Sequence, residues 1–362
     1  MKKNLLIPTT LTQNNFDLFR FLLATSVIFC HCYAIYYGWE RFAINEPFMR
    51  WSNGKISIGS AAVNFFFVIS GFLIVRSFQR SNNFWDYLKK RILRIYPGFI
   101  VVFLLGFLFF GPIGHLKEWS LPSYGEFLSS VPLKREVANM VSLQSPIEQR
   151  YFTFLPQYGL NNSLWTIQYE FICYLLVPLF FWAIYKRPKA LLLVSFFVAY
   201  GSLCLQSLGY IFPFKQELSG GIIGNPYYYP RFFTYFFSGA LVYCFRTKIP
   251  RNTWVFIGFF VLFSMSFKWQ SIDFIWPLTG TYLLFYMAYH PKLLFPNFAR
   301  HGDFSYGIYL YGWPLQQLVM LWFWPYLNPF TFFLAVMPLV LLFAFLSWTL
   351  VEKPALKLKS AK

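Results

Sequence analysis

The chain has 362 residues, of which 57% are hydrophobic, 24% aromatic and only 12% charged. Ordinary soluble proteins carry about twice that charged fraction, so the composition excludes one and predicts an all-α polytopic integral membrane protein. In a soluble protein the net charge of +18 would suggest a nucleic-acid partner. In a membrane protein, an excess of Lys and Arg in cytoplasmic loops explains it, and no nucleic acid is expected.

Ten apolar segments recur from one end of the sequence to the other. We interpret each as a transmembrane helix, because about 20 residues of helix span the hydrocarbon core. Together they predict one transmembrane domain over residues 1–362. The predicted spans are 16–37, 57–78, 95–111, 163–184, 189–210, 231–246, 253–268, 270–289, 303–324 and 329–350.

The Lys and Arg residues predict the orientation of these spans. With the N-terminus in the cytoplasm, 20 of the 31 fall inside, ten fall outside, and Arg20 lies within the first span. This bias predicts a multi-pass protein with both termini in the cytoplasm. The start of the sequence shows no cleavable signal peptide, so we expect the first span to direct insertion.

The first span, FDLFRFLLATSVIFCHCYAIYY, contains two ionisable residues, Arg20 and His31. Eleven positions at about 100° each place them on one helix face, about 16 Å apart along the axis. Such residues in a membrane helix indicate a pathway or a site in the bundle interior. The alternative is an Arg that reaches the interface and a structural His. Adjacent helical positions point about 100° apart, so Cys30, His31 and Cys32 are not expected to share a metal ion.

The second span carries Asn64 and Ser70 in an otherwise apolar helix, where an Asn is unfavourable unless it is paired. The next stretch, FWDYLKKRILRIYPG at 84–98, alternates aromatic and basic residues and is expected at the membrane interface. It suits anionic lipid headgroups, at about 1 kcal/mol per basic residue. It also suits a phosphorylated cytoplasmic ligand, because Arg binds phosphate through two parallel hydrogen bonds.

The long segment 112–162 is predicted to lie outside the membrane. Connections of this length either shape a functional site or act as passive linkers, and both interpretations stay open.

Glu170 is the one acidic residue near the middle of a predicted span. Counting residues from the two membrane surfaces puts Glu170 and His31 at similar depths, with Asn64 close to that plane. A carboxylate beside a histidine suits a general base, and a buried structural pair is the alternative.

The sequence HGDFSYGIYLYGWP, at the start of the ninth predicted span, places Asp303 and Ser305 as candidate helix N-caps. Tyr306 and Tyr309 follow. They either line a cavity or contribute to an aromatic belt at the membrane surface.

These segments resemble the motifs of membrane acyltransferase family 3, in the order in which that family has them. Arg20 and His31 match its Arg-x10-His signature. Further matches are VNFFFVISGFLI, KKRILRIYP, SLWTIQYE, DFSYGIYLYGWP and the closing Glu-x-Pro of Glu352 and Pro354.

The resemblance implies an O-acyltransferase of the bacterial inner membrane. Its donor would be cytoplasmic acyl-CoA, usually acetyl-CoA, and its acceptor an extracytoplasmic polysaccharide or a lipid-linked glycan. His31 would be the general base or a transient acyl carrier, with Glu170 as its partner. The CoA phosphates would be held by Arg20, Arg76, Arg91 and Arg94.

The resemblance also implies supporting roles for Ser70, Tyr306 and Tyr309. The family often has an acidic residue where this chain has Asn64, so a hydrogen-bonding role is expected there. A different class of function stays open, a transporter or flippase for a glycolipid or small anion, in which the central polar residues form a permeation path. A non-catalytic membrane scaffold is a third, less attractive possibility.

Overall fold

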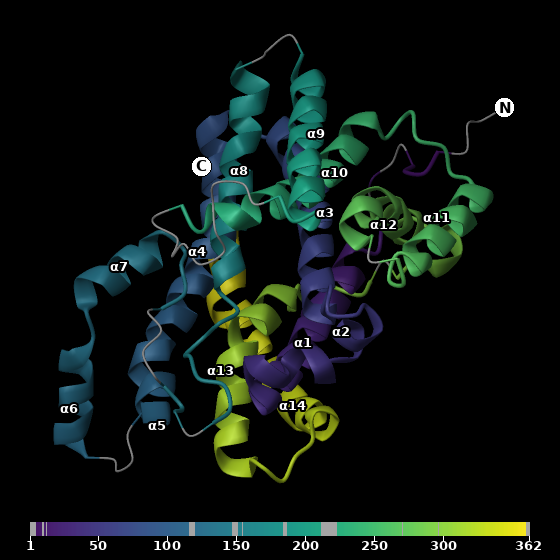
Figure 1. The fold of residues 1–362 in the computed structure, drawn as a ribbon. Helices are drawn as coiled ribbons and strands as arrows, with labels where there is room; N and C mark the ends of the chain where they lie inside the picture. Colours follow the sequence, from purple (N-terminus) through teal and green to yellow (C-terminus); the bar gives the residue numbers. More distant parts are fainter. Residues whose placement is uncertain are drawn as a thin grey trace.

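The fold is that of a helical bundle (Figure 1). The computed structural model describes residues 5–8, 11, 13–115, 120–146, 151–153, 155–183, 187–210, 223–269, 271–295 and 297–359. Every regular element in these ranges is a helix, and the one β contact is an isolated bridge between Leu5 and Pro250. The predicted all-α class is therefore confirmed.

Each of the ten predicted spans coincides with a helix. These helices are α1 (Phe16–Asn45), α3 (Ile58–Gln79), α4 (Phe84–Leu105), α8 (Trp165–Ala183), α9 (Pro188–Ser207), α10 (Tyr229–Phe245), α11 (Thr253–Met265), α12 (Ile272–Ala288), α13 (Ser305–Phe323) and α14 (Pro329–Ser347). The described chain has five stretches long and apolar enough to cross a membrane, built on α1, α3, α4, α9 and α14. Crossing by the other five stays a prediction.

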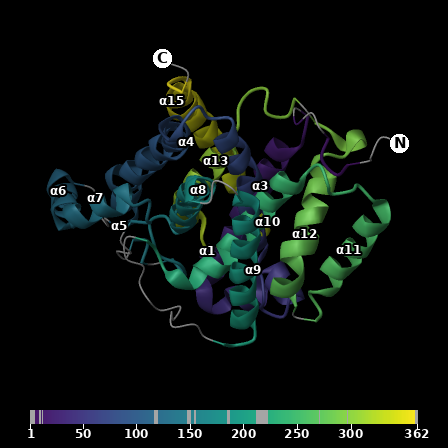
Figure 2. The ribbon, with the colours of Figure 1, turned by 90° about the horizontal axis from the view of Figure 1, so that it is seen from above.

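The structure extends one predicted span and shows helices within a segment predicted to lie outside the membrane. The basic segment 84–94 is not a separate surface element, because α4 continues from it into the span, with Pro97 inside the helix. The long segment 112–162, predicted to lie outside the membrane, contains the helices α5 (Gly111–His115), α6 (Leu121–Ser130) and α7 (Leu133–Val141). Figure 2 shows α6 and α7 projecting on the side opposite α11 and α12. Seven of the cations counted for the orientation lie outside the described residues, namely Lys2, Lys3, Lys117, Arg150, Lys186, Lys215 and Lys362.

Two prolines inside helices have their missing hydrogen bonds replaced by side chains. Pro178 cannot donate to the carbonyl of Tyr174, and the Tyr87 hydroxyl donates to that oxygen at 2.7 Å. Pro314 likewise frees the carbonyl of Leu310, which accepts from the Asn161 amide at 2.9 Å. Buried backbone oxygens need such partners in lipid, so these contacts connect α4 to α8 and the 161–164 segment to α13.

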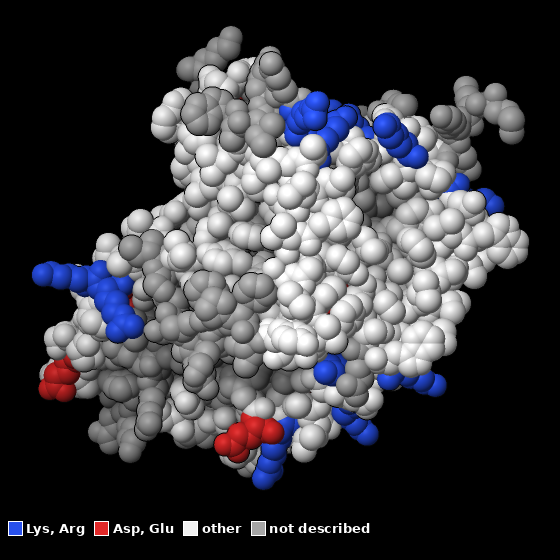
Figure 3. All heavy atoms as spheres, turned by 45° about the horizontal axis from the view of Figure 1, so that its top comes forward, with Lys and Arg blue, Asp and Glu red and all other residues white. Residues whose placement is uncertain are grey.

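Many large apolar side chains face outward, as expected of a surface in contact with lipid. On α9, Val194, Phe197 and Val198 are each more than half exposed, and on α11 Trp254 is 80% exposed. In Figure 3 the described Lys and Arg gather toward the margins of the visible face and leave a broad uncharged band between them. Surfaces of this kind indicate a membrane environment rather than water.

Helices α3 and α10 approach closely enough for their backbones to touch. A Cβ on Gly71 would lie 1.9 Å from the Phe236 carbonyl oxygen, and one on Gly239 would lie 1.9 Å from that of Val68. Small residues permit this approach in membrane helices, where packing rather than the hydrophobic effect drives association. The α3–α10 contact matters because α3 supplies one wall of the cavity described below.

We expect Gly71→Ala to destabilise the protein by about 3 kcal/mol, because the new methyl group forces two backbones apart. Gly201→Ala in α9 is the matched control, since a Cβ there meets nothing within 4 Å. It should be neutral or stabilising by about 0.5–1 kcal/mol, as Ala favours the helix. Thermal unfolding of purified protein in detergent measures both, and equal stability of the two variants would contradict the packing.

Candidate active site

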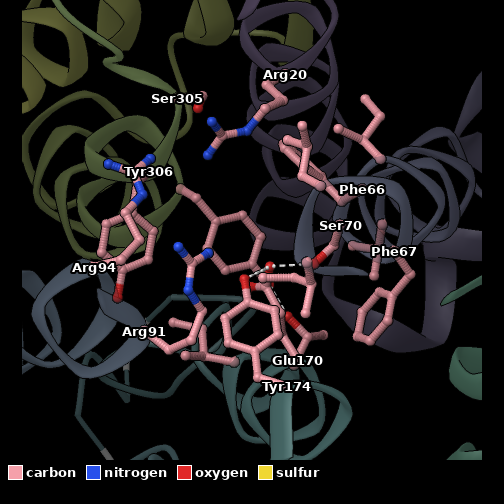
Figure 4. A pocket seen from close by; sticks show the side chains of 17 residues that line it. Arg20, Phe66, Phe67, Ser70, Arg91, Arg94, Glu170, Tyr174, Ser305 and Tyr306 are labelled. Atoms are coloured by element: carbon pink, nitrogen blue, oxygen red, sulfur yellow. Dashed lines mark hydrogen bonds between the residues drawn. The ribbon is translucent and has the colours of Figure 1, made fainter. Parts of the chain in front are cut away.

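A small cavity of about 130 Å³ lies among α1, α3, α4, α8 and α13 (Figure 4). Its polar lining comes from segments far apart in the sequence. Seven of the ten predicted site residues line it, namely Arg20, Ser70, Arg91, Arg94, Glu170, Tyr306 and Tyr309. Thr166, Tyr174 and Ser305 complete the polar part of the wall.

Glu170 is held by two hydroxyl groups inside this cavity. Its Oε1 accepts from Tyr174 at 2.6 Å and from Ser70 at 3.2 Å. Tyr174 lies four positions after Glu170 on α8, so the two side chains share one helix face. Sequence analysis missed Tyr174, although this spacing could have identified it.

Asp303 joins three parts of the chain by ion pairs. Its Oδ2 lies 2.5 Å from Arg20 Nη1 and 2.5 Å from Arg94 Nη2. Its Oδ1 accepts from the Ser305 backbone N–H at 3.2 Å and from the Ser305 hydroxyl at 2.5 Å, at the start of α13. The N-cap position of α13 is Phe304, so neither Asp303 nor Ser305 is the N-cap residue that the sequence suggested. Asp303 instead accepts from the first N–H of the helix and pairs with two cations, which sequence analysis did not foresee.

Glu352 gives Arg94 a second carboxylate. Its Oε2 lies 3.3 Å from Arg94 Nη1, its Oε1 accepts from Ser347 at 3.0 Å, and the side chain is 2% exposed. It ends a π-helical turn, Trp348–Glu352, that leads into α15 (Lys353–Lys357). The closing Glu-x-Pro motif thus fixes an arginine of the cavity.

Arg91 differs from Arg20 and Arg94, because no acidic side chain of the described residues pairs with it. Its Nη2 donates to Ser77 at 3.2 Å, and its buried Nε has no hydrogen-bond partner. Its guanidinium lies 6.0 Å from the Tyr87 ring centre and 5.8 Å from that of Tyr174. A buried guanidinium with spare donors on a cavity wall is suited to binding an anion.

The tyrosines of α13 line the cavity rather than forming a belt. The Tyr306 hydroxyl donates to the Ile95 carbonyl at 2.8 Å, and its ring lies under Arg94. The Tyr309 hydroxyl donates to the Ser163 carbonyl at 2.6 Å and lies 2.5 Å from that of Thr166. These bonds dock the start of α8 on α13 and so position Glu170.

His31 lies outside this cavity, and among the described residues no hydrogen bond joins it to Glu170. Its ring packs edge-on against Trp313, with centres 4.9 Å apart, and its buried Nδ1 has no partner. Trp313 follows Tyr309 by about one helical turn. The two predicted catalytic residues, His31 and Glu170, are therefore not in contact. Two residues at similar depth on different helices meet only if their side chains point toward each other, and depth alone does not determine this.

Asn64 and Arg76 also lie away from the cavity. Asn64 faces α10, where its Oδ1 accepts from Arg231 Nε at 2.7 Å, and Arg231 Nη2 donates to the Ser60 carbonyl at 2.8 Å. The hydrogen-bonding role expected for Asn64 is thus present, but it pairs with an arginine outside the cavity. Arg76 is half-buried near Tyr243 and Tyr289.

We expect Asp303→Asn to destabilise the protein by about 3 kcal/mol, because two largely buried cations lose their shared carboxylate. Asp86→Asn is the control, since Asp86 pairs with Lys90 only across one surface turn. Asp86→Asn should shift the unfolding temperature much less than Asp303→Asn, because exposed ion pairs contribute little to stability. Thermal unfolding in detergent compares them, and equal shifts would mean that Asp303 contributes no more than a surface ion pair.

Comparison with known proteins places the chain among acyltransferases. A family profile described as an acyltransferase domain matches residues 13–349. An "O-acetyl transferase" of Shigella phage Sf6 is 28% identical over 97% of this chain and 98% of its own length. "Nodulation protein 10" of Rhizobium leguminosarum bv. viciae is 27% identical over 96% of this chain and 95% of its own length.

A third relative, "Acyltransferase MdmB" of Streptomyces mycarofaciens, is 27% identical over 46% of this chain and 40% of its own length. No solved structure matches the chain. Because the family profile covers nearly the whole sequence, the protein belongs to this acyltransferase family, whose motifs it carries from Arg20 to Pro354.

Proposed function

We propose that the protein transfers an acyl group, acetyl in the simplest case, from cytoplasmic acyl-CoA to a hydroxyl of an extracytoplasmic polysaccharide or lipid-linked glycan. The observation that carries the proposal is the buried Arg91, which lines the same cavity as Glu170 and has donors to spare. The similarity to an O-acetyl transferase supports the acetyl group. We also propose that all ten helices cross a bacterial inner membrane, with both termini in the cytoplasm.

The charges around the cavity indicate which arginine contacts the acyl-CoA donor. Arg20 and Arg94 are neutralised in part by Asp303 and Glu352, whereas Arg91 is free to meet an anion. We therefore assign to Arg91 the closest contact with a donor phosphate, and to Arg20 and Arg94 the task of shaping the wall. Arg76 lies outside the cavity and is therefore not expected to contact the donor near its thioester.

In the reaction, the acceptor hydroxyl oxygen forms a bond to the thioester carbonyl carbon and the carbon–sulfur bond breaks. The hydroxyl proton leaves through a base and ends on the CoA thiolate. His31 is proposed as that base, or as the residue that carries the acyl group between the two substrates. Because His31 and Glu170 are not in contact, Glu170 is proposed to act on the donor side of the transfer.

The test is acyl transfer in membrane vesicles supplied with labelled acetyl-CoA on the cytoplasmic side. We expect His31→Ala to lower incorporation into extracytoplasmic glycan at least about 100-fold, the usual contribution of a general base. His301→Ala, in an exposed loop, is the control at equal expression and should retain activity. Full activity in His31→Ala would move the base elsewhere, and Glu170→Gln would then be tested.

We expect acetyl-CoA binding to depend on pH through Lys359. It follows α15, and burial lowers its pKa to about 8, with Arg91, Arg94 and Lys90 adding to the shift. Its ammonium is charged below that pH and neutral above it, so affinity for acetyl-CoA should fall as the pH rises from about 7 to about 9. Equilibrium binding of labelled acetyl-CoA to protein in nanodiscs measures this.

Lys359→Arg separates this residue from other titrating groups, because arginine stays charged throughout the range. We expect its binding curve to be flat at the wild-type level reached at low pH, and that of Lys359→Gln to be flat and weaker. A slope in Lys359→Arg equal to the wild type would assign the titration to another group.

A further inference from the structure

We propose that a second cavity, at the end of the bundle opposite the chain ends, binds a pyranose ring of the acceptor. The cavity measures about 790 Å³, within the usual range for small-molecule sites. It lies where α1 bends and where α13 gives way to α14, toward the bottom of Figure 1, whereas both chain ends are marked toward the top. This inference rests on the proposed function, since it assigns a site to that reaction's acceptor.

The bend in α1 depends on Gly38. Its φ of +70° is in the left-handed region, and a Cβ would lie 2.9 Å from the Pro156 carbonyl oxygen. Glycine is therefore required both for the backbone conformation and for the close approach of the 156–159 segment. The bend separates Trp39 and Glu40 from the straight part of α1 and directs this stretch to the cavity wall.

The opposite wall is anchored from α13. Trp313 Nε1 donates to the Gly159 carbonyl at 3.1 Å, and Gln317 Nε2 donates to the Gln157 carbonyl at 3.0 Å. Both α13 side chains are fully buried, so the 157–159 backbone is held on a rigid helix. The cavity is thus formed by fixed backbone on two sides, as expected for a binding site formed in advance of its ligand.

The chemistry of the wall matches a sugar. Trp39, Tyr158 and Trp324 are 53%, 48% and 41% exposed, and each lines the cavity. Glu40 and Arg41 add an acceptor and donors for hydrogen bonds. A pyranose combines an apolar C–H face, which packs on an aromatic ring, with hydroxyls that need such partners. Tryptophan and tyrosine also mark membrane surfaces, but a lipid boundary requires neither a concavity nor a carboxylate within it.

The position of His31 links this cavity to the reaction. Trp39 stacks on Trp313, with ring centres 6.3 Å apart, and Trp313 contacts His31. Tyr36, on the cavity wall, follows His31 by five residues, or about 7.5 Å along the helix. One turn before Trp313, Tyr309 lines the Glu170 cavity. His31, with its unpartnered Nδ1, therefore lies between the donor cavity and the proposed acceptor cavity.

The experiment is saturation-transfer difference NMR with the full chain in nanodiscs. The probes are the methyl pyranosides of glucose, galactose, mannose and rhamnose. We expect transfer to the ring protons of at least one of them, and at least a fivefold loss of that signal in Trp39→Ala. Tyr326→Ala is the matched control, because Tyr326 is 87% exposed beside this cavity but does not line it, and it should keep the signal.

Absence of transfer to every pyranoside in the wild type, or an unchanged signal in Trp39→Ala, would overturn the proposal. If Trp39→Ala fails to fold, Glu40→Gln decides, with the same loss expected. Labelled acetyl-CoA binding by the same samples keeps the two proposals apart. Sugar binding without acetyl-CoA binding would contradict the proposed donor and leave this site standing. Acetyl transfer to glycan without pyranoside binding would support the proposed function and contradict this acceptor site.

Discussion

The ion pairs around Asp303 are the interaction on which the rest of the site depends. Charged groups inside a membrane bundle are strongly destabilising unless paired, and here one carboxylate meets Arg20 from α1 and Arg94 from α4, while Glu352 meets Arg94 again. These contacts bring together positions 20, 94, 303 and 352, which span nearly the whole sequence. The cavity of Glu170 lies beside this network and takes Arg20 and Arg94 as part of its wall.

The network also separates two kinds of arginine that look alike in the sequence. Arg91 and Arg94 lie three positions apart in one basic motif, yet Arg94 has two acidic partners and Arg91 has none among the described residues. Arg94 therefore holds the structure together, and Arg91 retains donors for a ligand. A similar separation applies to His31 and Glu170. They lie in different parts of the bundle, connected through Trp313 and Tyr309 on α13, and this arrangement suits a transfer between substrates that arrive from opposite sides.

Much of the fold was predictable because helices in a membrane depend on local features. About 20 apolar residues suffice for a span, and each predicted span has its helix. The motifs pointed to Arg20, Ser70 and Glu170 as candidates, and the structure brings these three side chains to one cavity. The hydrogen-bonding role of Asn64 could be expected from the sequence, but its partner could not, because that partner is Arg231, 167 residues away. Depth follows from counting residues, whereas the face that a side chain presents depends on which helix packs beside it. Tyr174 was missed although its spacing from Glu170 was visible.

The sequence by itself determined the helical class, the positions of the helices and membership of an acyltransferase family. These follow from apolar length, local backbone hydrogen bonding and the order of motifs along the chain. Only the tertiary structure decided that Asp303 pairs with two arginines, that His31 lies apart from Glu170, and that Trp39, Tyr158 and Trp324 surround one cavity. Each of these arrangements joins residues far apart in the chain. They are set by close backbone contacts such as Gly71 with Phe236 and Gly38 with Pro156, whose partners no local pattern specifies.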